Sequence, residues 1–396
     1  MKIAMISFSS LPLSVGGSQI FTFNLIKKLL DKNHEIDFYL PRKYAEQFID
    51  ARLINHKNFK VKPIFYKENF FIIFFPLILK YVISIRQFYI KYDLWQVIGS
   101  YPAGYITAHL SKNIPVVLRS HGDDIQKDIT LNYGLRLNSK IEKKISSTIK
   151  NFTALVALTS AVTKEYLELG ANENRIKIIP NGVDNNRFNL KRNIGNLNKK
   201  NQIKLLTTGR YHKKKGYEYI VPVLKILINK GYNIEWTIIG RNTSILKKNI
   251  DDNQLQKYIK LEETISVNSA KKNLSINFPS KELIDKYNNA DIYVFPSLLE
   301  TFGMVLIEAM ASGLPVVTTN CPGCNDVVTH YEDGLVSNIK DSKDLAKNIE
   351  IIINNGELRG KLIENGLIKS KNHDWEIIAT MYENLYLKLI VNNKLN

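Results

Sequence analysis

The sequence predicts an α/β fold made of two doubly wound domains with parallel sheets. Three observations lead to this prediction. Short β-branched runs alternate with longer helical stretches along almost the whole chain. The length of 396 residues suits two domains of about 200 residues or slightly fewer each. A polar stretch rich in Asn and Lys follows Pro180 and continues to about Asn201, which is typical of a linker.

The elements of each half follow from these patterns. In the first half we expect strands at 2–8, 35–40, 94–98, 114–119 and 153–158, and helices at 18–32, about 77–91, 139–150 and 160–169. In the second half, strand, turn and helix recur at 203–208, 217–230, 234–239, 281–288, 291–295, 303–312, 314–318 and 342–354. Two similar halves follow from this repetition.

The composition is that of a soluble globular protein with a strong basic excess. Hydrophobic residues make up 44% and charged residues 23%, and the formal net charge is +18. Residues 1–180 carry 25 Lys and Arg against 14 Asp and Glu. The excess fits a solvated basic surface (in part drift towards AT-rich codons), an anionic membrane surface or phosphorylated substrates. No arginine-rich tract or aromatic-basic signature favours nucleic acid.

Cysteine content and apolar runs favour a cytoplasmic protein. The two cysteines, Cys321 and Cys324, cannot form a disulfide framework. We interpret residues 2–8 as a strand rather than the apolar region of a signal peptide. The apolar run from Phe70 to Leu79 ends at Lys80 and is too short to span a bilayer, which needs about 20 residues. It predicts a buried helix or an interfacial one on the membrane surface.

Two carboxylates stand out in the second half. A buried strand at 291–295 runs into a turn that contains Glu300, and a helix opens near Gly303 with Glu308 about one turn in. Ligands bind at the carboxyl ends of strands in open α/β sheets, and helix N-termini favour anions. Ribose hydroxyls could partner a carboxylate set in so apolar a helix. The alternative is that Glu300 caps the helix and Glu308 faces solvent.

Glycines, cations and one histidine follow other predicted strands. Gly16 and Gly17 come after the first strand, where a glycine pair lets the backbone approach a phosphate or sugar. Arg210 and the run Lys213 to Lys215 follow the first strand of the second half. His121, Asp123 and Asp124 follow the strand at 114–119. The alternatives are an ordinary turn, a solvated basic loop and a structural histidine.

The segment ETFGMVLIEAMASGLPVV, with seven residues between Glu300 and Glu308, resembles the motif of the retaining glycosyltransferases of family 4, which have the two-domain GT-B fold. The similarity covers nearly the whole chain and is clearest from Ile178 to Val328. It implies two Rossmann-like domains that face each other across a deep cleft. We expect an acceptor domain at 1–184, a nucleotide-sugar domain at 185–374 and a C-terminal helix at 375–396 that returns to the first domain.

The resemblance also implies roles for the residues above. Glu308 binds the ribose diol and Glu300 lies near the donor sugar. Backbone amides at Phe302, Gly303 and Met304 meet the sugar and diphosphate. The remaining implied residues are Arg210 and Lys215, which grip the diphosphate; Gly16 and Gly17, in the first turn of the fold; and His121, which faces the donor sugar.

Some positions depart from the family pattern. The family usually has Gly where Asn33 stands, and it has a glycine-rich loop near the donor where Cys321 and Cys324 stand. We interpret this Cys-x-x-Cys as a loop rather than a redox or zinc site. The family generally needs no metal, and the chain has no Asp-x-Asp triplet, so we expect neither a metal nor a cofactor.

The sequence therefore predicts a retaining glycosyltransferase. We expect it to move a hexose-type sugar from a nucleotide diphosphate, UDP first and GDP next, to a glycan or lipid-linked acceptor in bacterial surface polysaccharide or lipopolysaccharide synthesis. A cytoplasmic location, peripheral on the membrane, fits the charge. The alternatives are a sugar-nucleotide epimerase or phosphorylase of the same fold, and a non-catalytic basic module that docks on membranes.

Overall fold

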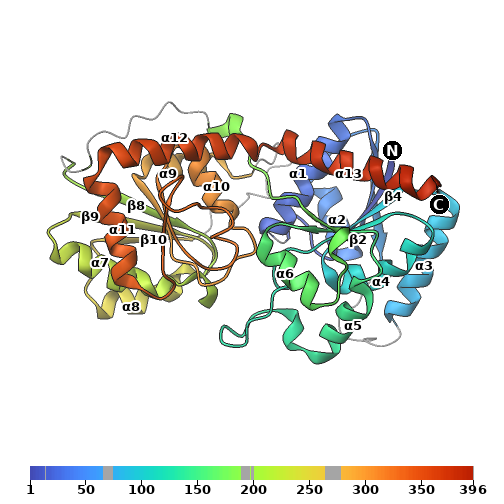
Figure 1. The fold of residues 1–396 in the computed structure, drawn as a ribbon, viewed down its shortest axis with the longest axis horizontal. Helices are drawn as coiled ribbons and strands as arrows, with labels where there is room; N and C mark the ends of the chain where they lie inside the picture. Colours follow the sequence, from blue (N-terminus) through green and yellow to red (C-terminus); the bar gives the residue numbers. More distant parts are fainter. Residues whose placement is uncertain (14, 66–74, 189–196, 198–199, 264–277, 396) are drawn as a thin grey trace. The chain divides into compact units, whose positions relative to one another are not determined.

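The computed structural model describes residues 1–396 except 14, 66–74, 189–196, 198–199, 264–277 and 396. Its described residues form two compact units (Figure 1). The first unit comprises Met1–Asn181 and Trp375–Asn396, and the second comprises the described residues from Gly182 to Asp374. Each unit has its own parallel sheet with helices around it, so the predicted pair of doubly wound α/β halves is confirmed.

The first unit contains a seven-stranded sheet with the order β3-β2-β1-β4-β5-β6-β7. Its strands are β1 (Lys2–Ile6), β2 (Glu35–Pro41), β3 (Phe59–Ile64), β4 (Leu94–Ile98), β5 (Val116–Arg119), β6 (Ala154–Ala157) and β7 (Ile176–Ile178). Its helices are α1 (Gly17–Asp31), α2 (Arg42–Asp50), α3 (Phe75–Ile90), α4 (Tyr105–Thr107), α5 (Ser139–Ile149), α6 (Ser160–Glu168) and α13 (Trp375–Leu395). The strand order reverses between β1 and β4, which is the switch point of this sheet.

The second unit contains a six-stranded sheet with the order β10-β9-β8-β11-β12-β13. Its strands are β8 (Ile203–Thr208), β9 (Ile234–Ile239), β10 (Ile259–Glu262), β11 (Ile292–Phe295), β12 (Val316–Thr319) and β13 (Leu335–Ser337). Its helices are α7 (Ile220–Asn229), α8 (Lys247–Asp252), α9 (Lys281–Asn289), α10 (Met304–Ala311), α11 (Ser342–Asn354) and α12 (Gly356–Asn372). Here the order reverses between β8 and β11.

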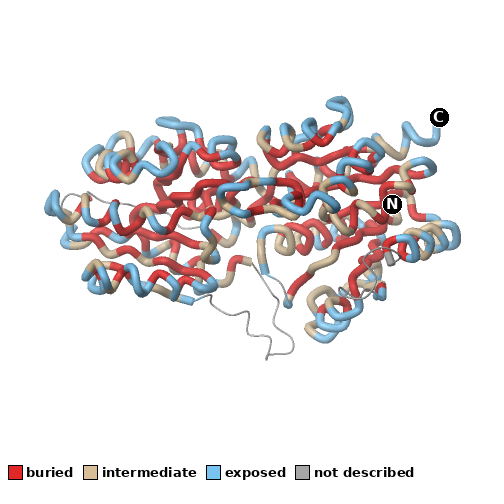
Figure 2. The backbone as a smooth tube through the Cα atoms, turned by 90° about the horizontal axis from the view of Figure 1, so that it is seen from below, coloured by how far each residue is buried: buried red, intermediate tan, exposed pale blue. Residues whose placement is uncertain are grey.

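Burial explains why these segments form strands. The inner strands of both sheets are rich in apolar residues because helices cover both of their faces. In β11, for example, Ile292–Phe295 are all fully buried. Figure 2 shows buried backbone along the centre of each unit and exposed residues on the outer helices.

The C-terminal helix α13 belongs to the first unit and packs against α1. The rings of Trp375 and Tyr382 lie 6.0 and 5.6 Å from that of Phe21 on α1. The Tyr386 hydroxyl donates a hydrogen bond of 2.6 Å to the side chain of Gln96 on β4. Helix α13 therefore forms part of the packing of the first unit, through α1 and β4.

Two sequence predictions lie partly outside the described residues. Of the apolar run Phe70 to Leu79, residues 70–74 are outside them, and the rest belongs to α3. Of the predicted linker, the structure describes little beyond the 3₁₀ turn η5 (Asn185–Phe188). No helix in the described part of the chain is long and apolar enough to cross a bilayer.

Candidate functional site

The candidate site lies in the second unit, at the carboxyl ends of β8 and β11. These strands are neighbours at the point where the strand order reverses, and ligands bind at such points in open α/β sheets. The loop after β8 carries Arg210 and Lys215, and the loop after β11 carries Glu300. The Nζ atom of Lys215 lies 2.5 Å from Oε1 of Glu300. We call this cluster the β8–β11 site.

The local backbone fixes Lys215. Residues Lys213–Lys215 form a 3₁₀ turn, and the His212 side chain accepts a hydrogen bond from the Lys214 backbone N–H at its start. Gly216 ends the turn with φ of 63°, and a Cβ atom there would lie 2.0 Å from the Pro296 carbonyl oxygen. Only glycine fits so close an approach. Lys215 therefore points to Glu300 from a constrained turn, while Arg210 and Lys213 are exposed.

Glu300 is a buried and charged carboxylate. Its Oε1 accepts from Lys215 Nζ and lies 3.0 Å from the Ser297 hydroxyl. Burial raises the pKa of Glu300, but the charges of Lys215 and Lys214 and the hydrogen bonds from Lys215 and Ser297 outweigh it. The pKa consequently lies below its ordinary value, so Glu300 is an anion at neutral pH. The N-cap position of α10 is occupied by Gly303 rather than by Glu300.

The Cys-x-x-Cys loop contacts the backbone of Glu300. The Glu300 backbone N–H donates a 3.0 Å hydrogen bond to the Pro322 carbonyl. Gly323 has φ of 85°, and a Cβ atom there would lie 2.3 Å from the Glu300 carbonyl oxygen. Cys321 and Cys324 are both free and fully buried. The loop therefore packs directly against the backbone of Glu300 and fixes its position.

Glu308 is also buried, so the alternative of a solvent-facing Glu308 is wrong. Its Oε2 accepts a 2.9 Å hydrogen bond from the Tyr287 hydroxyl on α9. That hydroxyl lies 3.0 Å from Oγ1 of Thr208, which in turn lies 2.8 Å from the Tyr293 hydroxyl. A chain of hydroxyl groups thus joins Glu308 to the end of β8.

Burial raises the pKa of Glu308 to about 7, although the hydrogen bond from Tyr287 and the charge of Arg187 act against this rise. Arg187 belongs to η5, and its neighbour Phe188 packs edge-on against the Tyr287 ring at 6.1 Å. Near neutral pH the carboxyl of Glu308 is therefore close to half protonated. A group that donates hydrogen bonds to this carboxyl would favour its anion.

The backbone between the two glutamates carries the other predicted site residues. Phe302 and Gly303 are buried and Met304 is the first residue of α10. Gly303 adopts φ of 76°, a left-handed conformation that suits glycine. The helix N-terminus therefore opens in the β8–β11 site, where its free backbone N–H groups favour an anion.

Sequence reasoning did not find Tyr287, Thr208, Ser297 or Arg187. Tyr287 and Thr208 look like ordinary core residues in the sequence, because their hydroxyls meet only after α9 packs against β8. Arg187 lies in the polar stretch after Pro180, which we interpreted from the sequence only as a linker.

The first unit holds the remaining predicted residues. Gly16 is the N-cap of α1 and Gly17 is its first residue. His121 follows β5, and its ring lies 5.1 Å from Phe21 on α1. Helix α1 therefore links the two positions: it begins at Gly17, and its Phe21 contacts His121. Burial and the charge of Arg119 hold the pKa of His121 well below its ordinary value, so its imidazole is neutral at pH 7.

Asp124 organises the loop around His121. Its Oδ1 accepts hydrogen bonds from the backbone N–H groups of His121 and Gly122, at 2.8 and 3.0 Å. Its Oδ2 accepts one of 2.7 Å from the Ser100 N–H. These bonds give Asp124 a structural role. In the described part of the chain, no three His, Cys, Asp or Glu residues are grouped as metal ligands.

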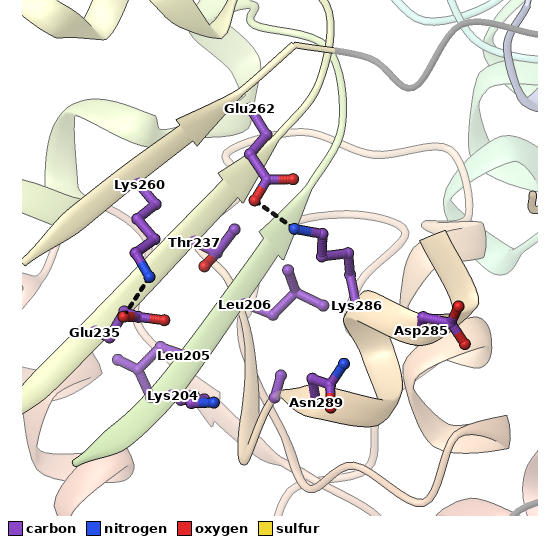
Figure 3. Close-up of a pocket in the computed structure, with 11 residues that line it drawn as sticks. Lys204, Leu205, Leu206, Glu235, Thr237, Lys260, Glu262, Asp285, Lys286 and Asn289 are labelled. Atoms are coloured by element: carbon purple, nitrogen blue, oxygen red, sulfur yellow. Dashed lines mark hydrogen bonds and ion pairs between the residues drawn. The ribbon is translucent and has the colours of Figure 1, made fainter. Parts of the chain in front are cut away.

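A separate hollow of about 370 Å³ lies between one face of the second sheet and α9 (Figure 3). Four of its charged side chains form two ion pairs: Lys286 Nζ lies 2.5 Å from Glu262 Oε1, and Lys260 Nζ lies 2.6 Å from Glu235 Oε2. None of the predicted site residues lines it. The hollow lies on a face of the sheet, whereas the β8–β11 site lies at the carboxyl ends of the strands.

Comparisons with known proteins fit this architecture. Residues 15–187 match Glycosyltransferase Family 4, and residues 190–368 match Glycosyl transferases group 1. CapM of Staphylococcus aureus, a capsular polysaccharide biosynthesis glycosyltransferase, is 32% identical over 253 residues, which are 60% of this chain and 62% of CapM.

Two further proteins are similar. An N,N'-diacetylbacillosaminyl-diphospho-undecaprenol alpha-1,3-N-acetylgalactosaminyltransferase of Campylobacter jejuni is 33% identical over 111 residues, 28% of this chain and 30% of that relative. The chain thus matches less than two thirds of the length of CapM and of this relative. The crystal structure of Anabaena HepE with UDP and glucose has a TM-score of 0.74 at 18% identity, covering 98% of this chain and 100% of HepE.

The HepE structure establishes the fold, and the two family matches together cover both units of the chain. The chain belongs to the glycosyltransferases of the GT-B fold, with a family 4 domain followed by a group 1 domain.

Proposed function

We propose that this chain is a retaining glycosyltransferase that moves a hexose-type sugar from a nucleotide diphosphate to a glycan or lipid-linked acceptor. The second unit holds the donor and the first unit holds the acceptor. The single observation that carries the proposal is the contact between Lys215 and Glu300 at the switch point of the second sheet.

The chemistry of donor cleavage explains the cations. Breaking the bond between the sugar and the diphosphate builds negative charge on the leaving group, and fixed cations stabilise that charge without a proton transfer. Lys215 is held in place by its turn and by Glu300, so it is organised before the donor arrives. Arg210, in the same loop and exposed, supplies a second cation.

Glu308 is the residue we assign to the ribose of the nucleotide. Its carboxyl has one hydrogen bond from Tyr287 and is buried beside the start of α10. Ribose hydroxyls would donate to this carboxylate while the α10 N-terminus, with the backbone of Phe302, Gly303 and Met304, would meet the phosphates and sugar. Glu300 then positions the donor sugar and needs no covalent role.

His121 is our candidate on the first unit, with Gly16 and Gly17 giving the backbone close access to the donor. Because its imidazole is neutral at pH 7, His121 would act as a hydrogen-bonding group rather than as a cation. The acceptor hydroxyl attacks from the face that the leaving group vacates, its proton passes to the departing diphosphate oxygen, and the anomeric configuration is retained. The proposal includes no metal or other cofactor.

The relatives support the choice of substrates. HepE was crystallised with UDP and glucose, which favours a UDP-sugar, with a GDP-sugar as the next choice. CapM and the Campylobacter relative favour surface polysaccharide or lipopolysaccharide synthesis and a lipid-linked acceptor. The net charge of +18 favours an anionic membrane surface as partner, and the two free thiols favour the cytoplasmic side.

Thermal unfolding with UDP, GDP, ADP and CMP tests the donor site. A ligand at about 100 times its dissociation constant adds roughly 2.7 kcal/mol to the unfolding free energy. We expect UDP to stabilise the wild type and Lys213→Ala, and to stabilise Arg210→Ala and Lys215→Ala much less. Lys213 is the matched control because it belongs to the same turn but is exposed.

Stabilisation by GDP alone would redirect the donor to GDP-sugars. Equal stabilisation of the wild type and all three variants would contradict the assigned diphosphate site. With an acceptor in hand, the anomeric configuration of the product, measured by NMR, tests retention, and release of a free or epimerised sugar nucleotide would favour an epimerase instead.

A further inference from the structure

Helix α3 exposes an apolar surface that the proposed reaction does not use. Its inner side is formed by Pro76, Leu79 and Ile83, which are buried. Among residues 76–90, every exposed side chain is large and hydrophobic, and exposed fractions run from 39% to 77%: Leu77, Ile78, Tyr81, Ile85, Phe88 and Tyr89. We call this set the α3 face. The helix lies at the periphery of the first unit (Figure 1).

The spacing of these residues makes one continuous stripe. Residues three, four and seven positions apart share a face of a helix, and the six residues follow that rule over the length of α3. A helix on a soluble unit normally turns charged residues outward. Helix α3 contains no Asp or Glu. Its two cations lie over aromatic rings, Lys80 4.0 Å from that of Tyr105 and Arg86 5.3 Å from that of Tyr39.

A basic hollow adjoins the α3 face. Oγ of Ser84 on α3 lies 2.7 Å from Nε2 of His109, and His109 lines a hollow of about 400 Å³. Its cations are Lys112, Lys150 and Arg175, and none of the described residues that line it is Asp or Glu. Arg175 donates from Nη1 to the carbonyls of Lys150 and Phe152, at 2.9 and 3.2 Å, so its guanidinium is held in place.

Aromatic and branched side chains beside cations are the composition of surfaces that lie in a membrane interface. The aromatic rings sit at headgroup depth, the aliphatic side chains reach the acyl boundary, and each nearby Lys or Arg attracts anionic headgroups. A water-soluble protein partner would explain the apolar stripe but not the adjoining hollow, whose lining cations have no carboxylate among them. The excess of 25 basic over 14 acidic residues in 1–180 adds long-range attraction to the same kind of surface.

We propose that the α3 face and the basic hollow beside it dock this chain on a bilayer of anionic phospholipid, with α3 lying in the plane of the interface. This inference rests on the proposed function, which names an anionic membrane as a partner. The inference adds the residues that would contact that membrane. Docking through α3 would hold the first unit, to which we assign the acceptor, at the surface where a lipid-linked acceptor resides.

Vesicle co-sedimentation of the full chain, without any sugar nucleotide, tests the proposal. We expect the wild type to bind phosphatidylglycerol vesicles at low salt and phosphatidylcholine vesicles at least about tenfold more weakly. The variant Tyr81→Ser/Phe88→Ser/Tyr89→Ser should bind at least about 30-fold more weakly than the wild type, because three exposed rings no longer enter the interface. Its control, Ile129→Ser/Tyr331→Ser/Ile368→Ser, removes three exposed apolar side chains elsewhere and should bind as the wild type does.

A charge variant separates the two parts of the surface. Lys112→Gln/Lys150→Gln should bind about 10- to 30-fold more weakly, at about three- to fivefold per cation, whereas Lys247→Gln/Lys248→Gln on the second unit should lose much less. Arg175 stays because its guanidinium supports the backbone. Wild-type protein that stays in solution with anionic vesicles at low salt would overturn the proposal, and so would unchanged binding of the aromatic variant.

Two further readouts keep the outcome clear. The melting shift with UDP should be the same in the aromatic variant and the wild type, which shows that the variant folds and separates docking from the donor site. Sedimentation velocity should find no dimer that depends on Tyr81, Phe88 and Tyr89. A dimer lost in the aromatic variant would assign the α3 face to a second copy of the chain and contradict membrane docking.

Discussion

The two units share a doubly wound parallel sheet but use their buried cations differently. In the first unit, Arg119 at the end of β5 is fully buried and donates to the Ile179 carbonyl, the Tyr382 hydroxyl and Asn181 Oδ1 at 2.5–2.9 Å. Its guanidinium also lies 3.7 Å from the Phe21 ring. In the second unit, Lys215 at the corresponding edge contacts a single carboxylate and remains partly exposed.

The difference separates a structural cation, Arg119, from the cation to which we assign a role in donor binding, Lys215. The guanidinium of Arg119 donates hydrogen bonds to three groups of its own unit and is fully buried, so little of its charge is available to a ligand. Lys215 keeps donors available, and its partner Glu300 is an acceptor that a ligand could share. On our proposal, the carboxyl edge of the first sheet holds a packing cation and that of the second sheet holds a donor-binding cation, and the following experiments test that division.

The largest expected effect is on catalysis in the second unit. Lys215→Ala should lower the rate of sugar transfer by about 10²–10³, by analogy with the loss of one preorganised donor in an oxyanion hole. Steady-state kinetics with the donor identified by the melting assay would measure it. Lys213→Ala, in the same turn, should retain the wild-type rate, and a similar loss in that variant would show that the loop charge as a whole matters rather than Lys215.

The next effect is on stability in the first unit. Arg119→Met should lower the free energy of unfolding by about 3 kcal/mol, because it removes three buried hydrogen bonds and a ring contact. Denaturant unfolding measures this value. Arg42→Met is the control, since Arg42 is exposed and pairs only with Glu46 four residues away. If Arg119→Met folded with wild-type stability, the structural role given to Arg119 would be wrong.

A smaller effect concerns pH and Glu308. With a pKa of about 7 in the free protein, Glu308 must lose its proton before ribose hydroxyls can donate to it, so nucleotide affinity should rise about tenfold from pH 6 to pH 8. The contribution of Glu308 to the unfolding free energy of the free protein has the opposite trend. This contribution is fully present below the ordinary pKa of a glutamate and is lost as the pH rises to about 7. Isothermal titration at several pH values measures the first trend.

Two variants test this pH assignment. Glu308→Gln should flatten the dependence of nucleotide affinity on pH. Tyr287→Phe removes the hydrogen bond that lowers the pKa of Glu308, so the midpoint should move to higher pH. A midpoint that stays in place in Tyr287→Phe would show that Tyr287 does not set the charge of Glu308.

The smallest effect is expected at the hollow of Figure 3. Lys286→Ala removes a partly exposed ion pair with Glu262 and should change stability by no more than about 1 kcal/mol. Sugar transfer should be unaffected, as measured beside Lys215→Ala. A strong loss of activity in Lys286→Ala would place function on the sheet face rather than at the strand ends.

The success of the sequence predictions depended on burial. All the inner strands of both sheets were predicted, because burial on two faces makes them rich in apolar and β-branched residues. The four strands that were missed, β3, β7, β10 and β13, are the edges of the two sheets. In β3 the sequence FKVKPI interrupts the apolar pattern with two lysines and a proline, as edge strands commonly do.

The site shows the same division between local and distant information. The spacing of Glu300 and Glu308 and the turn after β8 are local patterns, and they led to the residues that the structure brings together as Lys215 and Glu300. The Tyr287 hydroxyl reaches Glu308 from a different helix, and Ser297 reaches Glu300 through a bend after β11. Such contacts depend on tertiary packing, and a single sequence read by itself carries little signal of them.

The return of α13 to the first unit has a consequence for the order in which the protein is made. On a ribosome, all of β1 to β7 emerges before the second unit is translated, yet Tyr382 and Tyr386, the hydroxyl partners of Arg119 and Gln96, come among the last residues. At typical elongation rates this interval is on the order of ten to forty seconds. During this interval the guanidinium of Arg119 and the side-chain amide of Gln96 lack their hydrogen-bond partners on α13. The described residues of the second unit lie in one segment of the chain, so the second unit can fold before the first unit is complete.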